Sequence, residues 1–329
     1  MSKIAVLGSG TWGTALSVLL LKNGHDVVLW SFMEEEAEKL RNERVHPSLP
    51  GSTIPDELII TSDAGEALKD ASLIVMAVPS TATRETAERI KTLVRPDQPI
   101  VVVSKGIEEK TLFIQTEIIE DVIPSAKTAV LSGPSHAEEV IRSLPTVVVA
   151  GSKDKELALF IQETFMNPDF RVYESNDVKG IELGGSLKNV IALAAGMSDG
   201  LGYGDNAKAA LITRGVHEMS TLAVACGANP STLSGLTGIG DLIVTCDSMH
   251  SRNRRAGILI GQGKTMEEAT KEVKMVVEGV YSAKAALALG KKYNVSLPIM
   301  EAVNKVLFEG LPCRDAVYSL MCREKKSEF

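Results

Sequence analysis

The lysine at position 188 stands in a long apolar segment, where an amine can do acid–base chemistry. Residues 180–197 read GIELGGSLKNVIALAAGM, and Glu182 is the only other charged residue among them. Such a segment predicts a largely buried helix. Burial disfavours an ammonium and lowers its pKa, so a buried lysine can donate or accept a proton near neutral pH. The alternative is that Lys188 runs along the helix edge and keeps its charge in water.

Two later segments offer a partner for that lysine and a place for an anion. Asp241 lies in SGLTGIGDLIVTC, where a carboxylate among apolar residues needs a cation such as Lys188. Capping of the following helix is the alternative role for Asp241. Ser251, Arg252 and Asn253 concentrate donors that suit a phosphate or a carboxylate. A solvated helix face is the alternative for this run.

A glycine pattern near the start of the chain predicts a dinucleotide site. Residues 8–13 read GSGTWG, which fits G-x-G-x-x-G between a strand pattern and the helical segment TWGTALSVLLLKNG. Gly8 would allow a tight turn, Gly10 would let a pyrophosphate approach the backbone, and Gly13 would pack helix on strand. The helix N-terminus would supply amide donors. A strand–helix turn without a ligand is the alternative.

The residues after the second predicted strand bear on the choice between NAD and NADP. An acid there binds the ribose 2′-hydroxyl, whereas a basic residue favours a 2′-phosphate. Residues 30–34 read WSFME, with neither an acid at the strand tip nor an arginine or lysine. Glu34 is a candidate ribose ligand, but it also begins the charged segment EEEAEKLR, which is typical of a solvated helix. We therefore expect the site to use either cofactor, without a strong phosphate anchor.

Polar groups also follow two later strands. Lys105 ends VVVSKG, and a lysine at the carboxyl end of a central strand points into the ligand crevice of a parallel sheet. The segment SGPSHAEEV follows the next strand and begins a helix, which again offers amides to an anion. An ordinary loop lysine and a plain capped turn are the respective alternatives.

Short β-branched runs alternate with helical patterns over the first half of the chain, which predicts a doubly wound, parallel, Rossmann-type α/β sheet. The Pro-rich segment 44–62 reads as irregular. Expected strands are 4–8, 26–30, 73–78, 100–104, 128–133 and 146–151, and expected helices are 11–23, 34–43, 84–94, 111–121 and 136–142.

After about residue 180 strand patterns become scarce, so we expect an all-helical C-terminal domain. The division is a dinucleotide-binding domain at 1–180 and a helical substrate-binding domain at 181–329, with Lys188 at the junction. Two domains commonly hold a ligand between them. Further helices are expected from Asp205, as N-cap, to Cys226, and at 253–262, 266–273, 280–293, 299–308 and 313–323.

Composition bounds the class of protein. The 329 residues suit two domains, and the net charge of −7 argues against a nucleic-acid binder. Four cysteines without metal-ligand spacing fit a reduced, cytoplasmic protein without a metal site. No segment reaches transmembrane length without charges, so we expect no stable membrane insertion. The oligomeric state stays open, with a homodimer as one possibility.

Taken together, the segments GSGTWGTAL, SKG, LSGPSHAEEV, ELGGSLKNVIALAAG, GLTGIGDLIVTC, HSRNRRAG and VVEG resemble the bacterial-type NAD(P)-dependent glycerol-3-phosphate dehydrogenases over essentially the whole chain. This resemblance implies a Rossmann-type domain followed by a helical domain. It also implies the interconversion of dihydroxyacetone phosphate and sn-glycerol 3-phosphate with NADH or NADPH, in support of glycerophospholipid synthesis. Many members carry a basic residue where this chain has Phe32 and Met33, which puts a strong NADPH preference in doubt.

The resemblance also assigns roles to individual residues. Lys188 matches the catalytic proton acceptor and donor. The residues that match substrate contacts are Lys105, Gly133, Ser135, Lys188, Asp241, Ser251, Arg252 and Asn253. Those that match cofactor contacts, with the glycines of the turn, are Gly8, Gly10, Thr11, Trp12, Gly13, Lys105, Ala137, Arg252, Val276 and Glu278.

Two other functions compete with this one. Dehydrogenases of 3-hydroxy acids share the architecture and a catalytic lysine, but their usual Lys-x-x-x-Asn spacing would need asparagine at the position of Ala192. A nucleotide-sensing module without catalysis would bind the cofactor but leave Lys188, Asp241 and Arg252 without a use.

Overall fold

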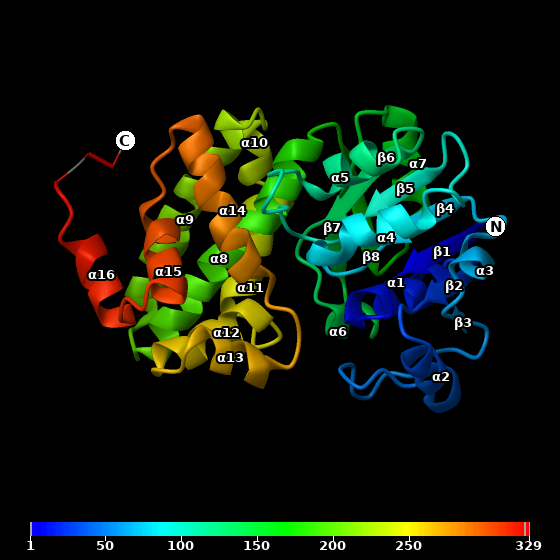
Figure 1. The fold of residues 1–329 in the computed structure, drawn as a ribbon, viewed down its shortest axis with the longest axis horizontal. Coiled ribbons are helices and arrows are strands. Elements are labelled where there is room, and N and C mark those ends of the chain that lie inside the picture. The colour runs from blue at the N-terminus through cyan, green and yellow to red at the C-terminus, as the bar shows by residue number, and fades with distance from the viewer. Residues whose placement is uncertain (1, 326, 329) are drawn as a thin grey trace.

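An eight-stranded sheet forms the first half of the chain in the computed structural model, which describes residues 2–325, 327 and 328. The strand order is β3-β2-β1-β4-β5-β6-β7-β8, and all neighbours are parallel except β6 and β7. The expected Rossmann-type sheet is therefore confirmed (Figure 1). The strands are β1 (Lys3–Leu7), β2 (Asp26–Trp30), β3 (Ile59–Thr61), β4 (Leu73–Met76), β5 (Pro99–Val102), β6 (Lys127–Ser132), β7 (Thr146–Gly151) and β8 (Phe170–Ser175).

Helices cover both faces of the sheet because alternate strand residues feed two apolar layers. Ile4 and Val6 of β1 belong to the layer shared with α1, α6 and α7, whereas Ala5 and Leu7 belong to the layer shared with α3, α4 and α5. The helices of this half are α1 (Thr11–Lys22), α2 (Glu34–Glu43), α3 (Ala64–Leu68), the 3₁₀ turn η1 (Ser80–Ala82), α4 (Thr83–Ile90), α5 (Gln115–Val122), α6 (Ala137–Val140) and α7 (Lys155–Phe165).

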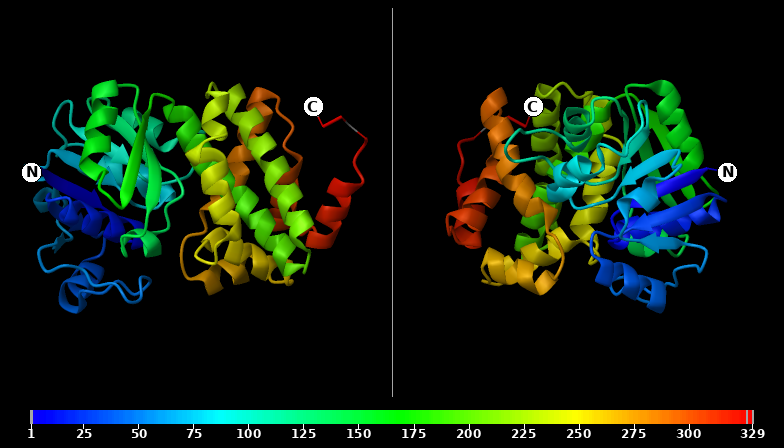
Figure 2. Two further views of the ribbon diagram at one scale, coloured as in Figure 1. Left: turned by 180° about the vertical axis from the view of Figure 1, so that it is seen from behind. Right: turned by 45° about the vertical axis from the view of Figure 1, so that its right-hand side comes forward.

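The second half is helical, as expected, and is built around one long central helix (Figure 2). Nearly all residues of α8 are buried, because α9, α11, α12 and α14 pack around it. The helices are α8 (Val178–Gly200), α9 (Asp205–Ala225), α10 (Pro230–Leu233), the π-helical turn η2 (Leu236–Gly240), α11 (Asp241–Asp247), α12 (Arg252–Gly261), α13 (Met266–Val273), α14 (Glu278–Tyr293), α15 (Pro298–Phe308) and α16 (Cys313–Met321).

Glycines bring α8 and α12 into backbone contact. A Cβ atom on Gly196 would lie 2.1 Å from the carbonyl oxygen of Arg254 and 2.9 Å from the Cα atom of Gly257. One turn later, a Cβ atom on Gly200 would lie 2.3 Å from the carbonyl oxygen of Ile258. Larger residues would push these helices apart, so the glycines fix the spacing between α8 and α12.

Polar contacts join the helical half to the sheet half. Glu182 of α8 is buried, and its carboxylate accepts hydrogen bonds from the backbone amide and the hydroxyl of Thr116 at the start of α5. Burial raises the pKa of Glu182 to about 8, although the bonds from Thr116 act in the opposite direction. Among the described residues, no helix meets the length and hydropathy that a membrane crossing demands. The division at residues 180 and 181 stays a prediction.

Several expected elements need correction. The segment 44–62 is not wholly irregular, because β3 adds to the sheet edge at its end. The strand β8 and the helices α3 and α7 were not expected. Strand β7 runs antiparallel to β6, across a connection that contains the single-turn helix α6. Asp205 is not the N-cap of α9, since Gly204 takes that position.

Candidate active site

The ammonium of Lys188 is bound inside the protein. Its Nζ atom donates to Asp241 Oδ1 at 2.6 Å and to Thr245 Oγ1 at 2.6 Å. Lys188 is 5 % exposed and Asp241 is 1 % exposed, so the alternative of a lysine extended into water is wrong. Asp241 begins α11 but does not cap it with its side chain, which leaves both carboxylate oxygens for cations.

A second lysine shares the same carboxylate. Lys105 lies three residues beyond the end of β5, and its Nζ atom donates to Asp241 Oδ2 at 2.7 Å and to the carbonyl oxygen of Gly133 at 3.0 Å. Gly133 has a φ of +148°, and a Cβ atom there would lie 2.9 Å from the Cα atom of Val148. Its carbonyl also accepts a bond from the hydroxyl of Ser135 at 3.0 Å.

The two lysines and one carboxylate set the acidity of the cluster. Burial lowers the pKa of Lys188 to about 8, and Lys105 acts in the same direction, whereas Asp241 opposes both. Burial alone would raise the pKa of Asp241, but Lys105 and Lys188 outweigh it and hold that pKa below its ordinary value. Lys188 can therefore exist as ammonium or as free amine near neutral pH, beside a permanent negative charge.

The glycine turn fits a bound pyrophosphate. Gly8 has a φ of +119°, and Gly13 lies so close to Gly8 that a Cβ atom on Gly13 would be 1.9 Å from its carbonyl oxygen. A Cβ atom on Gly10, by contrast, would meet no described atom within 4 Å, which leaves room for a ligand against the backbone. Gly10 also occupies the N-cap position of α1 without a capping side chain, so the first amides of α1, including those of Thr11 and Trp12, can face an anion.

A series of contacts leads from this turn to the lysines. Gly8 packs against the backbone of Ala77 and Val78, and two residues further the amide of Ser80 donates to Glu278 Oε1 at 3.0 Å. The Ser80 hydroxyl donates to the other oxygen of Glu278. Gly106, next to Lys105, packs against Ser80 and the same glutamate. This series of contacts therefore links the glycine turn to the lysine cluster.

The three residues expected to grip an anion begin α12 but differ in what they bind. Ser251 caps the helix by accepting the Arg254 amide at 3.2 Å. Asn253 is buried, donates to Asn189 Oδ1 at 3.0 Å and accepts from the Gly279 amide at 2.8 Å.

Arg252 is the member of this group that remains available to a ligand. Burial lowers its pKa, while Glu278 and Glu138 act in the opposite direction. Within the described part of the chain it makes no side-chain hydrogen bond or ion pair, unlike Arg254, which binds Asp199 at 2.8 Å. A half-buried, unpaired guanidinium is suited to an anion from outside the protein.

Two expected cofactor residues contribute only apolar surface. Ala137 begins α6, and Val276 lies in the connection between α13 and α14. Neither side chain carries a polar group, so each can offer a ligand only apolar surface or its backbone.

Two residues beside the Lys188–Asp241 cluster, Thr245 and His136, were not predicted from the sequence. Thr245 follows Asp241 by four residues, and this helical spacing would have placed its hydroxyl on the same face as the carboxylate. His136, inside SGPSHAEEV, lies 5.7 Å from His250 between ring centroids, and its buried Nε2 has no hydrogen-bond partner among the described residues. Burial, and then the charge of Lys188, lower the pKa of His136 to about 4, so the ring is neutral at pH 7.

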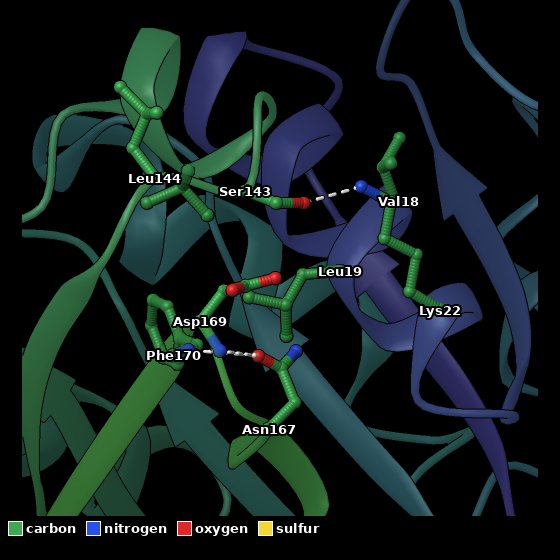
Figure 3. Close-up of a pocket in the computed structure, with 9 residues that line it drawn as sticks. Val18, Leu19, Lys22, Ser143, Leu144, Asn167, Asp169 and Phe170 are labelled. Carbon is green, nitrogen blue, oxygen red and sulfur yellow. Dashed lines mark hydrogen bonds between the residues drawn. The ribbon is translucent and has the colours of Figure 1, made fainter.

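A small pocket elsewhere in the molecule does not belong to this site. It lies where α1 meets the start of β8, and Figure 3 shows Lys22 bonded to Ser143 and the amides of Asp169 and Phe170 bonded to Asn167. None of its lining residues is a residue of the candidate active site.

Comparison with protein families covers both halves of the chain. The profile for the N-terminus of NAD-dependent glycerol-3-phosphate dehydrogenase matches residues 3–158, and the profile for the C-terminus of the same enzyme matches residues 177–318. A glycerol-3-phosphate dehydrogenase (NAD(P)+) from Agathobacter rectalis is 59 % identical over 329 residues, covering 100 % of this chain and 98 % of the relative. One from Fusobacterium nucleatum is 56 % identical over 332 residues, covering 100 % and 99 %.

A solved structure agrees with these matches. The crystal structure of glycerol-3-phosphate dehydrogenase from Coxiella burnetii superposes with a TM-score of 0.95 at 37 % identity, covering 98 % of this chain and 99 % of that one. These matches favour neither a 3-hydroxy-acid dehydrogenase nor a sensing module. The resemblance inferred from the motifs is confirmed, and the chain belongs to the NAD-dependent glycerol-3-phosphate dehydrogenase family.

Proposed function

We propose that this protein interconverts dihydroxyacetone phosphate and sn-glycerol 3-phosphate with NAD(H) or NADP(H), and so supplies glycerol 3-phosphate for glycerophospholipid synthesis. The observation that carries the proposal is the buried Lys188 ammonium, bound to Asp241 and held at a pKa of about 8. An amine with this acidity can donate a proton in one direction and accept one in the other.

Lys188 is the proton donor in reduction. The reduced nicotinamide, when bound, supplies a hydride to the carbonyl carbon. The carbonyl oxygen then gains negative charge, and Lys188 lies in a buried site where its positive charge stabilises that oxygen most strongly. Lys188 transfers its proton to the oxygen, which yields the secondary alcohol, and the neutral amine accepts that proton in the reverse reaction.

Asp241 fixes the position of the Lys188 ammonium, and Asp241 and Lys105 act on its pKa in opposite directions. The Asp241 carboxylate accepts bonds from both lysines, so it holds the Lys188 ammonium in one position with the help of Thr245. Lys105 adds a second positive charge at the mouth of the cluster, where 20 % of its side chain is exposed. This charge would attract an anionic substrate and a developing alkoxide.

The phosphate of the substrate belongs at Arg252 in this proposal. Arg252 has the unpaired guanidinium, and Ser251 and Asn253 hold the start of α12 in position through their own bonds. Asn253 keeps one amide hydrogen for a ligand, because the bond to Asn189 uses only one of its two. Binding energy from the remote phosphate would orient the carbonyl toward Lys188.

One assay tests the proposal directly. The purified protein is mixed with NADH or NADPH and dihydroxyacetone phosphate, and the loss of reduced-nicotinamide absorbance is followed. We expect a loss that depends on both partners and a product that a chiral assay identifies as sn-glycerol 3-phosphate. Cofactor binding without any oxidation would refute the enzyme and favour a sensing module.

The substitution Arg252→Ala tests the phosphate grip. We expect KM for dihydroxyacetone phosphate to rise roughly 10- to 100-fold, the effect of losing charge-assisted hydrogen bonds, with a smaller change in kcat. Unphosphorylated dihydroxyacetone should be a poor substrate for both forms, so the advantage of the phosphorylated ketone should shrink in the variant. The measurement is steady-state kinetics with both ketones.

Arg255→Ala is the matched control for that variant. Arg255 lies on the same helix but is exposed, so its removal takes the same charge from α12 without removing the Arg252 guanidinium. Saturation by dihydroxyacetone phosphate that is unchanged in Arg252→Ala would refute the grip.

We also propose that the protein acts in the cytoplasm and that a homodimer is its assembled form. The four cysteines are free thiols, which suits a reducing compartment. Tyr281 of α14 and Tyr318 and Met321 of α16 are large exposed side chains that a second copy of the chain would cover. The molar mass in solution, measured by static light scattering, tests the homodimer.

A further inference from the structure

Three side chains form a hydrogen-bonded group beside the glycine turn. The Ser31 hydroxyl donates to Glu36 Oε2 at 2.7 Å, and the Ser9 hydroxyl lies 2.9 Å from the same oxygen and 2.8 Å from Ser31 Oγ. Ser9 and Ser31 are buried, whereas Glu36, in the first turn of α2, is exposed. The two serines therefore hold the Glu36 carboxylate at the surface of the turn.

The position of this group corresponds to the adenosine ribose of a dinucleotide. In doubly wound sheets the ribose lies at the carboxyl end of the second strand, next to the glycine turn. Ser9 is the residue between Gly8 and Gly10, and Ser31 directly follows β2. The amide of Gly8 donates to the carbonyl of Trp30 at 2.9 Å, which places the turn and the end of β2 side by side.

The neighbouring charged side chains do not cancel the Glu36 charge. Arg89 lies over the ring of Phe32, 4.5 Å from its centroid, and Arg41 is ion-paired with Glu34. Burial lowers the pKa of His46, although Glu36 acts in the opposite direction, so this histidine is mostly neutral above pH 7. Glu34, which the sequence offered as a candidate ribose ligand or as the start of a solvated helix, accepts bonds from Arg41 and Ser62.

We propose that Glu36 is the residue that makes this site select NAD(H) over NADP(H), an inference that rests on the dinucleotide site of the proposed function. The Glu36 carboxylate can accept a hydrogen bond from a ribose 2′-hydroxyl. A 2′-phosphate at the same place would bring a second negative charge against it. The phosphate would also find the two serine hydroxyls, its natural donors here, already bonded to the carboxylate.

The test is a binding measurement that needs no turnover. Calorimetric titration of the full chain compares ADP-ribose with 2′-phospho-ADP-ribose, which contain the adenosine half without the nicotinamide. We expect the 2′-phosphorylated ligand to bind roughly 10- to 100-fold more weakly, as a like-charge contact in a partly screened site produces. Because Glu36 is exposed, added salt should narrow this difference.

Two variants and one control separate the carboxylate from its surroundings. Glu36→Gln keeps an oxygen for the serines but removes the charge, and it should reduce the preference to within a few-fold; Glu36→Arg should reverse it. Glu35→Gln removes the neighbouring exposed charge from the same turn and should leave the ratio unchanged. Thermal melts show that each variant is folded.

The outcomes distinguish this inference from the proposed function. Equal binding of the two ligands by the unaltered protein, or an unchanged ratio in folded Glu36→Gln and Glu36→Arg, would overturn the role of Glu36 and leave the dehydrogenase intact. Failure of both ligands to bind would overturn the dinucleotide site, and with it both proposals.

Discussion

Replacing Lys188 with alanine should remove nearly all turnover while the nicotinamide cofactor still binds. The variant loses both the proton donor and the positive charge that stabilises the developing alkoxide. We expect kcat to fall by roughly 10³- to 10⁴-fold, the combined range for a general acid and an electrostatic contact. The glycine turn is built from other elements, so NADH affinity, measured by tryptophan fluorescence, should change little.

Two controls test the Lys188→Ala result: a second lysine variant on the same helix and rescue by added amines. Lys179→Ala removes a lysine near the start of α8 that pairs with Glu117 at 3.0 Å, and it should keep a near-normal rate. Small primary amines added to Lys188→Ala should restore part of the activity by entering the space that the side chain leaves. A near-normal rate in Lys188→Ala without any added amine would refute the assignment.

Replacing Asp241 with asparagine should lower both activity and stability. The substitution leaves Lys188 and Lys105 close together without their common counter-ion. Loss of one partner from a buried ion pair costs about 3 kcal/mol of unfolding free energy, which denaturant titration can measure. Asp247→Asn is the matched control, because Asp247 lies on the same helix α11 but is exposed.

The pH–rate profile of Asp241→Asn distinguishes an effect on the pKa of Lys188 from a purely structural role of Asp241. In the proposed mechanism reduction needs protonated Lys188, so the rate of the unaltered enzyme should fall as pH rises through about 8. Asp241 raises the pKa of Lys188, and its removal should therefore move this fall to lower pH. A falling limb at the same pH in both forms would show that Asp241 does not tune the lysine.

Local patterns predicted most of the elements. The glycine turn and the β-branched runs identified β1, β2, β4, β5, β6 and β7, because strands buried on both faces are continuously apolar. The strand β8 escaped this test because its residues FRVYES alternate buried apolar with exposed polar side chains at the sheet edge. Short elements such as β3 and α3 are stabilised by neighbours distant in sequence, which no local pattern reveals.

The chemistry of burial predicted the centre of the site. The sequence predicts the pairing of Lys188 with Asp241, because each is a charge in an apolar segment and needs a partner. The contact between Lys105 and Asp241 does not follow from local sequence, because the two residues are 136 positions apart. The sheet topology brings Lys105 to the Asp241 carboxylate. The bonds of Asn253 to Asn189 and Gly279 depend in the same way on how α8, α12 and α14 pack.

The backbone contact between α8 and α12 has a consequence for the size of the substrate. Lys188 lies on α8 and Arg252 begins α12, and Gly196 and Gly257 bring the backbones of these helices into contact. The distance between the backbone positions that carry the amine and the guanidinium is therefore constrained by main-chain contact, which cannot yield as side chains do. In the proposed function the carbonyl lies at Lys188 and the phosphate at Arg252, so this spacing of the two helices would select the length of the carbon chain between those groups.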